Sequence, residues 1–88
     1  MISSIVLTGL LKEVTNDGFR LIETHNSDAL NPENDIICLI PLLYWTRDMA
    51  NPLNNAPENM FAVIKGHLEN DAKHGLYVLV ESLHLGNK

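Results

Sequence analysis

Apolar and polar residues alternate along this chain in five stretches that predict β-strands. In the first stretch, residues 5–14, one face carries Ile5, Leu7, Gly9 and Leu11, and the β-branched residues near its start favour a strand. The other four stretches are residues 19–25, 36–45, 60–70 and 76–85. The chain is therefore expected to belong to the all-β class.

The connections between these stretches carry turn signals. The sequence TNDG at residues 15–18 ends in Asp17-Gly18, and DAKHG at residues 71–75 ends in Gly75. Glycine adopts the left-handed conformation that tight turns need, so both segments predict hairpins. The polar residues 26–35 predict a surface loop between the second and third strands.

Prolines shape the third strand and the segment that follows it. Pro41 has no backbone N–H, so the third strand is expected to bend, to end or to lie at an edge there. Pro52 and Pro57 exclude a long helix. A short helical turn, with Thr46 or Asp48 as its cap, is what remains for this crossover.

Five short strands and no long helix leave two architectures, a partly open barrel or a small sandwich. Gly9 and Gly66 both fall in the middle of a predicted strand. Strands of a small barrel coil sharply, and glycine permits such bends. The two glycines therefore favour the barrel.

Two segments resemble a known family. IVLTGLL at residues 5–11 and FAVIKGHLEND…GLYVLVESL at residues 61–83 resemble the single-stranded-DNA-binding protein family and its relative, the primosomal replication protein N. Those families open with the form apolar-x-apolar-x-Gly-x-Leu and carry Val-x-Val-x-Gly-x-Leu in the fourth strand. The resemblance implies one OB-fold-like domain over residues 1–88, a five-stranded barrel with a short irregular or helical crossover between the third and fourth strands.

The resemblance also implies a function, single-stranded nucleic-acid binding as an accessory to DNA replication or recombination. Such proteins stack bases on aromatic rings and meet phosphates with basic side chains. If Phe19 and Leu21 face the core, Arg20 faces outward. The candidate contact residues are Arg20, Trp45, Arg47, Phe61 and Lys65.

The net charge of −5 limits this function, because strong salt-driven binding to nucleic acids needs an excess of basic residues. We therefore expect weak binding to single-stranded DNA, with about four phosphate contacts and a salt slope of about −3. The alternative is an acidic protein-interaction module without nucleic-acid affinity.

The third and fifth strands carry apolar residues on both faces, so one apolar face of each strand would be exposed to solvent in a monomer. Burial of such side chains stabilises by about 1.5–3 kcal/mol each. A homodimer or a higher homo-oligomer is therefore expected, and a separate protein partner is the other way to cover these faces. The candidate interface residues are Leu39, Leu43, Tyr77, Leu79 and Leu83.

Other chemistry has little support in the sequence. The single cysteine, Cys38, allows no intramolecular disulfide, and the four histidines lack metal-ligand spacing. No nucleophile stands beside a base, so we expect neither an enzyme nor a cofactor or metal. The first residues lack the features of a signal peptide and no stretch is long enough to span a bilayer, so we expect a cytoplasmic protein.

Overall fold

The computed structural model describes residues 4–27, 30, 35–46, 48 and 50–86. This part of the chain is mostly β-structure, with five strands and one short helix. The elements are β1 (Ser4–Val14), β2 (Arg20–Ser27), β3 (Asp35–Tyr44), α1 (Pro52–Asn55), β4 (Phe61–Asp71) and β5 (Gly75–Gly86). Every strand begins and ends within two residues of its expected position.

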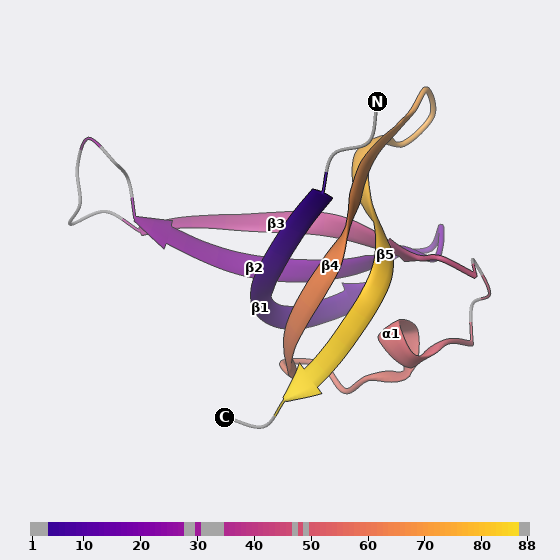
Figure 1. Cartoon of the computed structure of the whole chain (residues 1–88), viewed down its shortest axis with the longest axis horizontal. Helices are drawn as coiled ribbons and strands as arrows, with labels where there is room; N and C mark the ends of the chain where they lie inside the picture. The colour runs from indigo at the N-terminus through magenta and orange to yellow at the C-terminus, as the bar shows by residue number, and fades with distance from the viewer. Residues whose placement is uncertain (1–3, 28–29, 31–34, 47, 49, 87–88) are drawn as a thin grey trace.

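The five strands form one closed sheet in the order β1-β2-β3-β5-β4, with β4 returning to β1 (Figure 1). Four of the pairings are antiparallel. The fifth pairing, between β3 and β5, is parallel and spans Leu42–Tyr44 of β3. This short parallel contact closes the sheet.

Two glycines stand where neighbouring strands approach each other closely. A Cβ atom on Gly9 would lie 2.2 Å from the backbone oxygen of Glu23, and one on Gly66 would lie 2.0 Å from that of Leu79. Both distances are far shorter than any van der Waals contact, and both neighbours are backbone atoms. The close approach is the physical reason for glycine in the middle of β1 and β4.

The core lies inside the closed sheet. Its fully buried members are Leu11, Ile22, Leu42, Leu53, Ala62, Ile64, Val78 and Val80. On β4 the expected inward face is observed at Ala62, Ile64 and Gly66. Leu68 has the same parity but is exposed, and among the described residues the pairing of β1 with β4 reaches only to His67.

The prediction of which side chains of β2 point inward is wrong. Arg20, Ile22 and Thr24 are all buried, so they form the inward face of this strand. Phe19 does not belong to the strand: its backbone oxygen accepts from the N–H of Thr15 at 2.7 Å and closes the turn. The inward face therefore starts one residue later than the alternation predicted.

A bulge changes the parity of β5. Lys65 pairs with Ser82 and Gly66 pairs with Val80, so Glu81 is an extra residue in this strand. Beyond the bulge Leu83 packs against the core. Leu83, a predicted interface residue, is therefore half-buried against the core and not on the fully exposed surface.

The turns and the crossover follow their sequence signals in part. Gly18 and Gly75 take φ values of 90° and 77°, as predicted for tight turns. The helix cap is Asn51, whose side chain accepts from the N–H of Asn54 at 2.8 Å, and neither Thr46 nor Asp48 serves as the cap. Pro52 starts the helix, where its missing N–H costs nothing.

The loop predicted at residues 26–35 is shorter than expected, because β2 continues to Ser27 and β3 starts at Asp35. Residues 28–29 and 31–34 of that loop lie outside the described part of the chain. No helix among the described residues is long and apolar enough to cross a membrane.

Candidate nucleic-acid interface

A cleft of about 240 Å³ lies where the β1–β2 turn meets the β4–β5 turn. We call it the loop cleft. Its residues come from the β1–β2 turn, the outward faces of β2 and β3, and the β4–β5 turn. They are Thr15, Asp17, Phe19, Leu21, Pro41 and His74.

Aromatic rings form one wall of the loop cleft. The ring of Phe19 lies 5.1 Å from the ring of His74 and 5.1 Å from the ring of Tyr77, between centroids. The Phe19–Tyr77 pair meets edge to face, a favourable geometry for aromatic pairs. Phe19 is buried, whereas His74 is exposed. His74 is therefore the ring of this pair that is open to solvent.

His74 joins the two turns through its ring nitrogens. Nδ1 lies 2.5 Å from Oδ2 of Asp71, and Nε2 lies 3.4 Å from Oδ2 of Asp17. The hydrogen bond from His74 lowers the pKa of the Asp71 carboxyl group below its usual value. These contacts place two carboxylates beside the cleft, where they accept hydrogen bonds and repel phosphates.

A second depression, the outer groove, has a volume of about 440 Å³ and crosses β1, β2 and β4. Its residues are Thr8, Gly9, Leu10, Glu23, His25 and Phe61. The outward face of β2 links the two depressions, because Leu21 lines the loop cleft while Glu23 and His25 line the outer groove. Both depressions therefore lie beside the outward face of β2.

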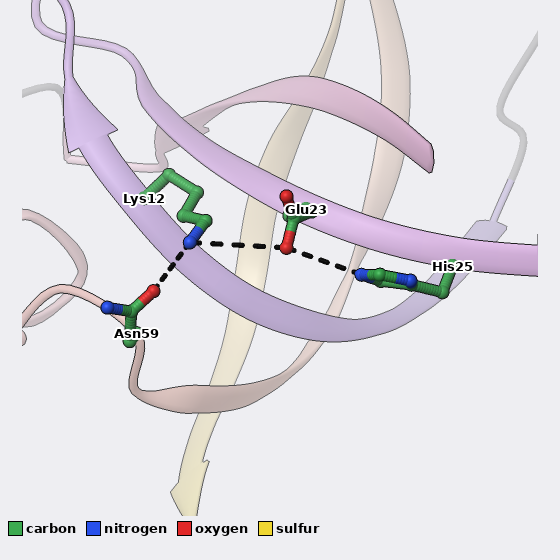
Figure 2. A network of polar contacts seen from close by, with 4 residues as sticks. All are labelled: Lys12, Glu23, His25 and Asn59. Atoms are coloured by element: carbon green, nitrogen blue, oxygen red, sulfur yellow. Dashed lines mark hydrogen bonds and ion pairs between the residues drawn. The ribbon is translucent and has the colours of Figure 1, made fainter. Parts of the chain in front are cut away.

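Figure 2 shows the polar network at this groove. Glu23 Oε1 lies 3.3 Å from His25 Nε2 and 4.0 Å from Lys12 Nζ. Lys12 also donates to Oδ1 of Asn59 at 2.5 Å. Asn59 has a positive φ of 70°, and its N–H donates to the backbone oxygen of Leu11. The network therefore ties the end of the crossover to β1.

Arg20, predicted to face nucleic acid, is instead buried, with 2% of its surface exposed. Its guanidinium donates five hydrogen bonds to backbone oxygens. The acceptors are Lys12, Leu53, Asn54, Ala56 and Pro57. Burial lowers the pKa of Arg20, and the carboxylate of Glu58 acts in the opposite direction. Arg20 therefore fixes the crossover to the sheet and has no surface to offer a phosphate.

The other predicted contact residues are not gathered in one place. Lys65 is exposed and Phe61 is half-buried, and both lie on the outward face of β4. Trp45 is exposed just after β3, with its ring 6.1 Å from that of Tyr44. Arg47 lies outside the described residues. Of the described members of this set, only Phe61 lines one of the two depressions.

The predicted interface residues separate into two groups. Leu43 and Leu79 are half-buried neighbours in the parallel pairing of β3 with β5, and Tyr77 contacts Phe19 at the loop cleft. Leu39, by contrast, is largely exposed on β3. Among these predicted interface residues, Leu39 on β3 is therefore the most open to solvent.

Histidine also meets carboxylates on the outward face of the β4–β5 hairpin. His67 Nε2 lies 2.5 Å from Glu69 Oε2, and His67 Nδ1 lies 2.6 Å from Glu81 Oε2. The hydrogen bond with Glu69, followed by that with Glu81, raises the pKa of His67. Only the protonated ring donates from both nitrogens, so this arrangement favours the imidazolium form.

The alternation of the sequence does not predict the loop cleft, because the two turns that form it are far apart along the chain. Phe19 is buried, as expected of a core residue, and the spacing of the histidines gives no signal for the position of His74. The described residues hold no group of three or more histidine, cysteine, aspartate or glutamate side chains that could bind a metal ion.

A scan against models of protein families and a search of curated proteins found no match to this chain.

Proposed function

We propose that this protein binds single-stranded nucleic acid and that its closed sheet is an OB-fold barrel. The observation that carries the proposal is the loop cleft. OB folds bind oligonucleotides on the face of their second and third strands, between the loop joining strands 1 and 2 and the loop joining strands 4 and 5. The loop cleft lies between the same two loops, with Leu21 of β2 and Pro41 of β3 as its floor. The strand order and the parallel β3–β5 pairing also support this fold.

A base in the loop cleft would stack on His74 at the aromatic wall, while Asp17 accepts a hydrogen bond from an amino group of the base. The next bases along the strand would follow the outward face of β2 toward Phe61. We also propose that the chain belongs to the single-stranded-DNA-binding protein family, which its sequence resembles.

The electrostatic part of the binding would be small. Arg20 is buried and cannot contact a phosphate. The basic residues that remain as candidate phosphate contacts are Lys65 and Arg47, together with Lys73 in the β4–β5 turn. Three phosphate contacts at about −0.7 each predict a salt slope of about −2 on a single strand. Stacking would therefore supply much of the affinity, at about 1–3 kcal/mol per base.

A titration of a fluorescent oligothymidine with the protein, followed by anisotropy at two salt concentrations, tests this proposal. We expect binding with a slope of about −2 and a loss of about tenfold or more in His74→Ala, since one stacked base is removed. His84→Ala is the matched control, because His84 lies on the same hairpin but away from the loop cleft. Equal affinity of the two variants, or no binding at low salt, would contradict the proposal.

A protein-interaction module without nucleic-acid affinity is the second candidate. The observation that favours it is that three histidines, His25, His67 and His74, each lie beside a carboxylate. These carboxylates lie at both depressions and on the β4–β5 hairpin. Under this function the oligothymidine titration shows no salt-dependent binding.

A further inference from the structure

The β2–β3 hairpin extends beyond the rest of the sheet as a two-stranded arm, formed by residues 24–27 and 35–38. The pairing of β2 with β1 reaches only to Glu23, and that of β3 with β5 covers only Leu42–Tyr44. Figure 1 shows the arm projecting away from β4 and β5. Two-stranded ribbons are marginally stable in water, so a further strand on this arm would stabilise it.

Pro41 shows which backbone groups point away from β2. The register of β2 with β3 is continuous from Arg20–Leu42 to Ser27–Asp35. In an antiparallel pair, residues that bond to the partner strand alternate with residues whose N–H and C=O point away from it. Proline is tolerated where its missing N–H would point away. Ile37 and Leu39 share the parity of Pro41, so their N–H and C=O groups lie on the outer edge of β3.

No strand in the described part of the chain pairs with this edge of β3 over residues 35–41. The side chains beside it are apolar, with Ile37 57% and Leu39 55% exposed. The adjoining strand of the arm, β2, instead carries Glu23 and His25 on its outward face. Natural sheets protect open edges with charges, prolines or bulges, and here Asp35 and Pro41 stand only at the two ends of the edge. The edge therefore has the chemistry of a strand-pairing site.

We propose that a second copy of this chain pairs with the β3 edge, antiparallel and about a two-fold axis at Cys38. Cys38 is the midpoint of residues 35–41, so the whole edge pairs with itself. In this register Ile37 exchanges two backbone hydrogen bonds with the partner's Leu39, and the symmetric pair exchanges two more. Asp35 falls opposite the partner's Pro41 in this register. The segment is its own complement, which selects a second copy over an unrelated peptide.

This register makes a distinctive prediction for Cys38. It lies opposite the partner's Cys38 at a position without backbone hydrogen bonds, where Cα atoms are about 4.5 Å apart. That separation lies within the range that a disulfide spans. Mild oxidation should therefore link two copies through Cys38. The proposal is independent of nucleic-acid binding.

Sedimentation equilibrium and oxidative cross-linking of the full chain test the pairing. We expect a dimer in the wild type and a loss of at least about tenfold in dimer affinity for Leu39→Lys, because each symmetric site then desolvates a charge. Leu76→Lys is the control, since Leu76 is 59% exposed on β5, away from the arm, and this variant should remain dimeric. Oxidation should give a reducible dimer in wild type and far less in Leu39→Lys. A wild-type monomer at about 100 µM, a dimer that persists in Leu39→Lys, or a dimer without the Cys38 cross-link would overturn the proposal.

Discussion

Replacement of Arg20 by methionine should be among the most destabilising single changes in this protein. Methionine keeps the length of the side chain but donates none of the five hydrogen bonds that Arg20 makes. The bond to the Leu53 oxygen is buried and the others are partly buried. A buried carbonyl left without a donor costs about 1–3 kcal/mol, and water restores only part of the remainder. We expect a loss of about 3–5 kcal/mol, because several charge-assisted hydrogen bonds are lost together and at least one carbonyl stays buried without a donor.

Urea unfolding followed by far-ultraviolet circular dichroism measures this loss. Lys65→Met is the matched control, because Lys65 is exposed on β4 and its replacement should change the free energy of unfolding by less than about 0.5 kcal/mol. Arg20→Lys should lie between the two, since lysine keeps the charge but cannot reach all five oxygens. The reasoning is refuted if Arg20→Met unfolds within about 0.5 kcal/mol of the Lys65→Met control.

Three further changes test the fold. Gly66→Ala should destabilise by more than about 2 kcal/mol because its Cβ meets the Leu79 backbone, while Gly86→Ala, whose Cβ has ordinary space, should be mild; urea midpoints compare them. His67→Gln should reduce the free energy of unfolding most below pH 6.5, because the protonated ring binds both carboxylates. The loss should become smaller as the pH rises through the raised pKa of His67. Equal losses at acidic and alkaline pH would contradict this, and His84→Gln is the control. Asn51→Ala should cost about 1 kcal/mol in thermal unfolding through loss of the helix cap, and the exposed Asn55→Ala much less; equal melting temperatures would reject the cap.

The sequence predicted the strands well because alternation and turn residues are local signals. Each strand lies within two residues of its expected range, and Gly18 and Gly75 take the left-handed conformation. The alternation predicted the wrong inward face in two places, where one residue is not paired with the neighbouring strand. Phe19 closes a turn instead of starting β2, and Glu81 forms a bulge in β5. Each single-residue shift reverses every side chain that follows.

The candidate site depended on information that alternation does not contain. The loop cleft exists because closure of the sheet brings the β1–β2 turn beside the β4–β5 turn, which are far apart in the sequence. The same closure buries Arg20 against the crossover carbonyls. A charged residue on a strand is normally exposed, so nothing local to Arg20 indicated a structural role.

Chemical-shift mapping of backbone amides during addition of oligothymidine tests the central claim most directly. The account predicts that the largest changes fall on the loop cleft, at Thr15, Phe19, Leu21 and His74, and continue along the outward face of β2. Smaller changes should reach Phe61. The absence of changes at saturating oligonucleotide, or changes confined to residues away from β2 and the two turns, would contradict nucleic-acid binding at this site.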